Sequence, residues 1–140
     1  MDLDGLHSAS GRGMVARTLE ELFVYRRSLD LLVRIIAITD RSDVKSHRRF
    51  CEEWLEATES VSKNTAEGFG RVYPGDFARF VSVARGSLYE VRTMLKHAEI
   101  KGLVPDSEAQ ELLGMIKQID LGLARLFAYL RREARRQRKC

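Results

Sequence analysis

The apolar residues between positions 77 and 98 follow a spacing that leaves few choices of fold. They recur three or four positions apart, at Phe77, Phe80, Ala84, Leu88, Val91, Leu95 and Ala98. A second run with similar spacing contains Leu112, Ile116, Ile119, Leu123, Leu126 and Leu130. Such spacing places the apolar side chains on one face of an α-helix, and no part of the chain alternates as a strand does. The pattern therefore predicts an all-α fold.

Turn and capping residues divide the chain into four predicted helices. These cover residues 19–39, residues 42 or 46 to 69, residues 76–101 and residues 105–130. Thr18 and Glu21 have the spacing of a capping box at the first helix, and Gly102 is a natural C-terminal cap for the third. Short connections favour an antiparallel up-down-up-down bundle. Three glycines inside helices mark expected close approaches, at Gly86, Gly114 and Gly122.

The two ends of the chain differ from the bundle, which we predict over residues 18–130. Residues 1–17 mix glycine, serine and isolated charges without an apolar period, so we expect a disordered leader there. Met14 is an alternative to Met1 as the start of the protein. Residues 131–140 are expected to continue the fourth helix as a basic tail.

The first predicted helix is apolar on two sides. One surface, at core spacing, comprises Leu22, Tyr25, Leu29, Leu32 and Ile36. The other comprises Phe23, Val24, Leu31, Ile35 and Ile38. A helix in a small bundle normally buries a single stripe, so a second surface requires another subunit or a hydrophobic ligand. Oligomerisation is the simpler choice, and we assign the second surface to an oligomer interface.

The positive charge is concentrated at the C-terminus. The whole chain has a net charge of +4, whereas residues 131–140 alone hold six basic side chains and one acidic side chain. The basic members are Arg131, Arg132, Arg135, Arg136, Arg138 and Lys139. Such a run is typical of a contact with a polyanion, and it is equally typical of a solvated helix end. Both interpretations remain open at this point.

The bundle topology adds further arginines to this tail. In an up-down-up-down arrangement the start of the first helix, the turn between the second and third, and the end of the fourth share one end. That places Arg26, Arg27, Arg71 and Arg79 near the tail. We therefore predict a nucleic-acid-binding surface at this end of the bundle.

Motifs for catalysis and for cofactor binding are missing from the sequence. Two cysteines without CxxC spacing and without a signal peptide favour a reducing, cytoplasmic location. None of the three histidines follows a glutamate by three positions, as a di-iron bundle requires, so we predict neither metal nor cofactor. No nucleophile motif converges with a base, and no apolar run is long enough for a membrane span. We expect a protein that is not an enzyme.

Four short segments, taken in order, resemble a known family. They are LFVYRRSLDL (22–31), SKNTAEGFGR (62–71), FARF (77–80) and ARGSLYE (84–90). They are similar to successive signatures of the four-helix bundle proteins encoded within intervening sequences of 23S ribosomal RNA genes. The likeness extends over about residues 20–130. A longer arginine-rich end and a more acidic second helix depart from the family pattern.

The resemblance implies an antiparallel four-helix bundle that assembles as a homopentameric ring. The family is also similar to accessory variability determinant proteins of diversity-generating retroelements, which associate with a reverse transcriptase and nucleic acid. It supplies no catalytic residue. Within its motifs, five polar residues are interpreted as a buried network that fixes the bundle register, with a ligand site as the alternative: Asn64, Glu67, Arg79, Ser87 and Glu90.

Two functional hypotheses follow from the sequence. The first is a homo-oligomeric RNA-binding or ribonucleoprotein accessory protein, in which ring symmetry repeats the basic end and adds weak contacts together. The second is a protein-interaction scaffold, such as an accessory factor for a retroelement reverse transcriptase. The natural nucleic acid or protein partner does not follow from the sequence.

Overall fold

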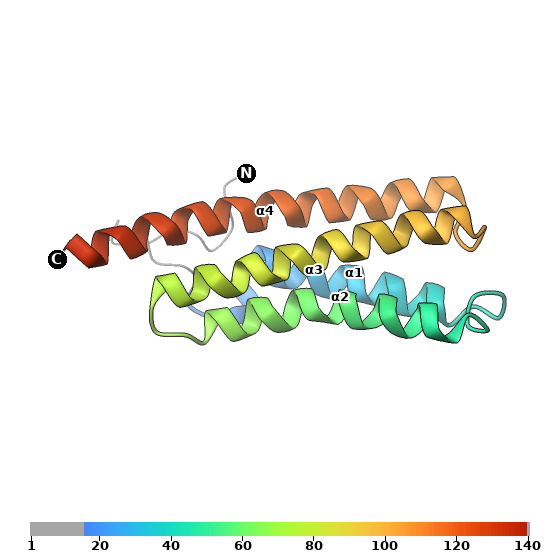
Figure 1. Ribbon diagram of the computed structural model, residues 1–140, viewed down its shortest axis with the longest axis horizontal. Coiled ribbons are helices and arrows are strands. Elements are labelled where there is room, and N and C mark those ends of the chain that lie inside the picture. Colours follow the sequence, from blue (N-terminus) through green and yellow to red (C-terminus); the bar gives the residue numbers. More distant parts are fainter. Residues whose placement is uncertain (1–15, 140) are drawn as a thin grey trace.

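Four long helices and one short one make up residues 16–139, the part of the chain that this computed structural model describes. The elements are η1 (Leu19–Glu21), α1 (Phe23–Thr39), α2 (Arg48–Phe69), α3 (Pro74–Ile100) and α4 (Asp106–Lys139). Neighbouring long helices run antiparallel, as Figure 1 shows. The predicted all-α four-helix arrangement is confirmed. The predicted leader, as far as residue 15, and the alternative start at Met14 lie outside the described residues.

The core runs along the bundle between the four long helices. Leu31 of α1, Trp54 of α2, Leu88 of α3 and Leu123 of α4 are each 0% exposed. Burial of a side chain of this size contributes about 1.5–3 kcal/mol. The helices α3 and α4 together supply most of the buried apolar residues, and all of their periodic residues except Phe80 are among them. Within residues 16–139 no helix is long and apolar enough to cross a membrane.

The start of α1 differs from the prediction. Thr18 makes no side-chain cap, and the Glu21 carboxylate instead accepts a hydrogen bond of 3.0 Å from the backbone N–H of Arg17. Leu22 has an extended backbone, with φ −80° and ψ 114°, and its side chain is 1% exposed. The chain bends at Leu22 to bury this side chain. The α-helix therefore begins at Phe23.

The connections between the later helices follow from local sequence. Pro74 occupies the first turn of α3, where its missing N–H costs nothing, so α3 starts two residues earlier than predicted. At the other end of α3, Gly102 has φ 73°, and its N–H bonds to the Glu99 carbonyl while the Leu103 N–H bonds to that of Ala98. This pair of bonds forms a Schellman motif, which confirms Gly102 as the residue that terminates α3.

The helical glycines divide into two kinds. A Cβ on Gly122 would lie 2.6 Å from Cγ1 of Val24, so α1 and α4 approach closely there, as predicted. Gly86 and Gly114 have no heavy atom within 4 Å of an added Cβ, and the prediction of close approach is wrong for both. The close approach between α2 and α3 instead lies at Gly68.

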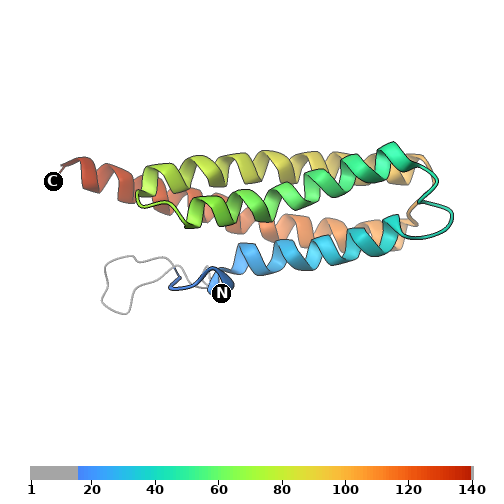
Figure 2. The same ribbon diagram turned by 90° about the horizontal axis from the view of Figure 1, so that it is seen from below.

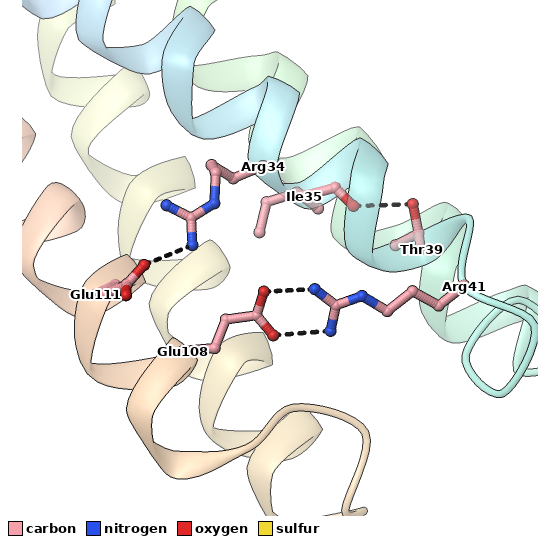
Figure 3. A network of polar contacts seen from close by, with 6 residues as sticks. All are labelled: Arg34, Ile35, Thr39, Arg41, Glu108 and Glu111. Carbon is pink, nitrogen blue, oxygen red and sulfur yellow. Dashed lines mark hydrogen bonds and ion pairs between the residues drawn. The ribbon is translucent and has the colours of Figure 1, made fainter.

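Ion pairs connect α1 and its following loop to α4 at the end of the bundle opposite the C-terminus. Arg41 donates two hydrogen bonds to Glu108, of 2.7 and 2.5 Å, and Arg34 donates one of 2.9 Å to Glu111 (Figure 3). The Arg41 guanidinium lowers the pKa of the Glu108 carboxyl from its ordinary value of 4.5, and Arg34 adds to this effect. A carboxyl with a depressed pKa stabilises the folded state above its unfolded pKa.

Glu108→Gln is therefore expected to lower the free energy of unfolding by about 1 kcal/mol at neutral pH. The effect is modest because Arg41 is 39% exposed to solvent. The difference from the native protein should shrink as pH falls below 4.5, because the native carboxyl then becomes protonated too. Denaturant unfolding of both proteins between pH 7 and pH 3 measures this. Glu111→Gln, at a side chain 66% exposed, is the control and should cost less than about 0.5 kcal/mol. A pH-independent difference for Glu108→Gln would contradict the assignment.

Candidate nucleic-acid interface

The last turns of α4 project beyond the rest of the bundle. Leu130 and Ala134 are 2% and 7% exposed, so the core-facing stripe of α4 continues to residue 134. At that level a Cβ on Gly75, near the start of α3, would lie 3.8 Å from the Cβ of Ala134. Beyond it, α4 extends past the α2–α3 turn in both views (Figures 1 and 2). The arginine-rich segment is therefore helical and open to solvent on most sides.

Seven exposed arginines gather around this projection. We call them the basic end: Arg71, Arg79, Arg131, Arg132, Arg135, Arg136 and Arg138. Arg136 pairs with Glu133 at 2.8 Å, and the guanidinium of Arg131 lies 5.7 Å from the centroid of the Phe127 ring. Arg132, Arg135 and Arg138 form no ion pair with any residue between 16 and 139. The predicted tail residue Lys139 has a side chain outside the described part.

The turn between α2 and α3 carries two exposed side chains beside the basic end. The Gly70 N–H bonds to the Ala66 carbonyl as α2 ends, and Pro74 opens α3. Between them, Val72 and Tyr73 are 85% and 65% exposed. Exposed residues of this kind in a tight turn gain nothing from the core, so they are available for a contact outside the chain.

Two arginines of this region share one aromatic ring. The guanidinium carbons of Arg71 and Arg79 lie 4.7 and 4.6 Å from the centroid of Phe80. Arg71 also donates a hydrogen bond of 2.8 Å to Glu67. A cation–π contact at an exposed site is worth about 0.5–1 kcal/mol, which favours one side-chain position. The contacts thereby favour defined positions for the two charges at the surface.

A cavity of about 340 Å³ lies between the α2–α3 turn and the last turns of α4. Its apolar lining includes Phe69, Tyr73 and Phe77 from the region of the turn and Tyr129 from α4. Arg71, Glu133 and Gln137 supply polar groups. This combination of aromatic rings with a few polar side chains is found in sites for small molecules.

Two of the predicted nucleic-acid-binding residues lie elsewhere. Arg27 donates a hydrogen bond of 2.9 Å to Gln118, and Arg131 follows about 20 Å further along α4. Arg27 also pairs with Asp30 at 3.2 Å. Arg26 precedes it on α1 and donates to the Glu20 carbonyl. Because α1 begins only at the level of Gly122, the prediction that Arg26 and Arg27 join the tail is wrong, whereas Arg71 and Arg79 lie at the predicted end.

The apolar surface of α1 that was assigned to an oligomer interface lies in the core of one chain instead. Val24, Leu31, Ile35 and Ile38, assigned to an oligomer interface, are at most 4% exposed within one chain, and Phe23 is partly buried. They pack in the core and leave almost no surface for a partner. Three other apolar side chains of α1 are exposed: Leu29 and Ile36 from the predicted core surface, and Val33, which was in neither predicted set. We call them the α1 stripe, and their exposures are 37% for Leu29, 65% for Val33 and 49% for Ile36.

The polar residues of the family-like motifs form a smaller network than predicted. Asn64 donates to the Ser60 carbonyl and hydroxyl, each at 2.9 Å, and the Ser60 and Ser87 hydroxyls are 2.7 Å apart. These three side chains link α2 to α3. The other predicted members, Glu67, Arg79 and Glu90, are exposed, so the prediction of one buried network is wrong for them.

Several residues of the polar network, of the cation–π contacts and of the cavity do not belong to the set predicted from the sequence. Ser60 carries no signal, because a single serine in a helix has many roles. Tyr73, Phe80 and Tyr129 also fall outside the predicted site. The segment Val72-Tyr73-Pro74-Gly75 did contain a usable sign, since a valine and a tyrosine between Gly70 and Pro74-Gly75 lie in a short connection that has no core to enter.

Comparisons with known proteins agree with this architecture. The family model described as 23S rRNA-intervening sequence protein matches residues 20–125. A crystal structure of a protein of unknown function from the S23 ribosomal protein family of Bacteroides thetaiotaomicron has a similar fold, with a TM-score of 0.70. The alignment covers 76% of this chain and 96% of that one at 16% identity. No curated protein matches the sequence.

Proposed function

The chain belongs to the 23S rRNA-intervening sequence protein family, and we propose that it is a non-enzymatic, homo-oligomeric protein that binds nucleic acid, with RNA as its ligand. The observation that carries this proposal is the basic end. Arg132, Arg135 and Arg138 are exposed and have no ion-pair partner among residues 16–139. Guanidinium groups form paired hydrogen bonds to phosphate, and such contacts depend on charge and shape more than on base sequence.

We propose that the assembly is a homopentameric ring, as the family resemblance implies. The α1 stripe supports self-association, since three apolar side chains at helical spacing remain exposed on one chain. A ring presents the basic end once per subunit. Several weak phosphate contacts then act on one nucleic-acid molecule, and their combined avidity exceeds that of a single subunit.

The test replaces Arg132, Arg135 and Arg138 by glutamine and measures binding to a structured RNA and to duplex DNA across a salt series. Removal of each phosphate-binding side chain should lower the slope of log affinity against log salt by about 0.7–0.9. The matched control replaces Lys45, Arg48 and Arg49 by glutamine, which removes the same charge at the opposite end of the bundle. Equal slopes for the two triple variants would show that net charge alone drives binding and would refute a site at the basic end.

A protein-interaction scaffold is the second candidate, and the α1 stripe is the observation that favours it. The same exposed residues suit a different protein partner, such as a reverse transcriptase of a retroelement. In that case one polypeptide should copurify with the protein after nuclease treatment. Absence of nucleic-acid binding by the native protein at moderate salt would give this candidate the lead.

A further inference from the structure

The cavity beside the basic end has a chemistry that differs from that of a phosphate site. Its lining contains Glu133, whose carboxylate is paired with Arg136 at 2.8 Å and so gives an entering phosphate group neither a donor nor a free positive charge. Its other members include three aromatic residues, Phe69, Phe77 and Tyr129, as well as polar groups from Arg71 and Gln137. A negatively charged ligand group is therefore unsuited to the interior. A flat, largely uncharged ring with polar edges fits these surroundings better.

Tyr129 adds a donor without a partner. Its hydroxyl oxygen is buried and has no hydrogen-bond partner in the part of the chain that the structure describes. Burial raises the pKa of this hydroxyl and the neighbouring Glu133 raises it further, so the group stays protonated at neutral pH. A buried hydroxyl without a partner is uncommon, and a bound ligand with an acceptor atom would satisfy it.

The rim of the cavity supplies a positive charge and an exposed aromatic ring. Tyr73 is 65% exposed and lines the cavity, so one face of its ring is open for stacking. Arg71 also lines it and is held against Phe80 at 4.7 Å. Positive charge thus lies at the edge, and aromatic surface leads inward. This order matches a nucleotide whose base enters the cavity and whose phosphate remains outside.

We infer that the cavity between the α2–α3 turn and α4 binds one unpaired nucleobase of an RNA strand, stacked on Tyr73 and hydrogen-bonded by Tyr129. The inference rests on the proposed function and adds to it a preference for unpaired bases over duplex RNA. A base within a duplex is stacked and paired and cannot enter a cavity, whereas bases in loops, bulges and single strands can. The volume, about 340 Å³, is at the low end for ligand sites and suits a single base.

The experiment compares three labelled probes: a single-stranded RNA, the same strand with abasic positions, and a duplex RNA. Tyr73→Ala should weaken binding of the single strand about tenfold. Tyr129→Phe, which keeps the ring, should weaken it by a smaller factor. Neither change should affect the abasic strand or the duplex. Tyr89→Ala, at an exposed tyrosine of α3 elsewhere on the bundle, is the control and should bind all probes as the native protein does.

Equal affinity of the native protein for the base-containing and abasic strands, or no effect of Tyr73→Ala on the single strand, would overturn the inference. Free nucleoside monophosphate that competes as well as the strand would overturn it too, because the ligand would then be a nucleotide and not a strand. The salt series with the arginine variants separates this result from failure of the proposed function. If those variants lower the slope while the tyrosine variants change nothing, only the base site is refuted.

Discussion

Gly68→Ala is expected to lower the free energy of unfolding by about 2 kcal/mol, and Gly86→Ala to raise it by about 1 kcal/mol. Both glycines lie inside helices, so alanine improves the helix propensity at each. They differ in their surroundings. A Cβ on Gly68 would lie 2.7 Å from Cδ1 of Phe77, whereas a Cβ on Gly86 meets nothing within 4 Å.

The contact at Gly68 cannot be relieved by a side-chain rotation alone. The same Cβ would lie 2.9 Å from Cβ of Phe80 and 3.2 Å from the Phe77 carbonyl oxygen, and both atoms move only with the α3 backbone. Phe77 is itself packed edge-on against Phe69, with ring centroids 6.1 Å apart. Alanine must therefore push α2 and α3 apart. Overpacking of this kind costs about 1–3 kcal/mol.

Denaturant unfolding of the native protein and of the two variants measures these opposite changes. Gly114→Ala is a second control, since its Cβ also has open space. If Gly68→Ala unfolds at the same denaturant concentration as the native protein, α2 and α3 are packed more loosely than the distances around Gly68 indicate. A loss of stability for Gly86→Ala that grows with protein concentration would indicate that another subunit approaches α3 at this position.

The helices themselves follow from sequence because their apolar periods are long and consistent. The period of residues 77–98 permits one buried face, and α3 buries it, with Leu88 and Val91 fully inside. Helix ends are less certain from sequence because they depend on single residues. The capping spacing of Thr18 and Glu21 was overridden by the need to bury Leu22, which no local pattern expresses.

The candidate site was only partly predictable, for two physical reasons. First, α1 is apolar on both faces, so its period offers two candidate core faces, and only packing against α2 and α4 selects Leu31 and Ile35 over Val33. Second, the topology shows which helix ends lie at the same end of the bundle. It does not show how far each helix extends there, because the helices differ in length. α4 runs far past the start of α1, so Arg27 lies level with Gln118 and not with the tail.

Substitutions in the α1 stripe are expected to change the oligomeric state. Val33→Glu together with Ile36→Glu should convert the proposed oligomer to single subunits, because each carboxylate would be buried without a partner in the proposed apolar interface. The penalty for burying such a charge is several kcal/mol. The fold of one chain should survive, since Val33 and Ile36 are 65% and 49% exposed and contribute little to its core.

Sedimentation measurements across a range of concentrations report the change in mass from a multiple of the 16.0 kDa subunit to one subunit. Val83→Glu, at a side chain 47% exposed on α3, is the matched control and should leave the assembly intact. If Val83→Glu dissociates the protein and the α1 variant does not, the interface lies on α3. Dissociation should also weaken the proposed RNA binding although no arginine has changed, because a single subunit has one basic end and loses the avidity of the proposed ring.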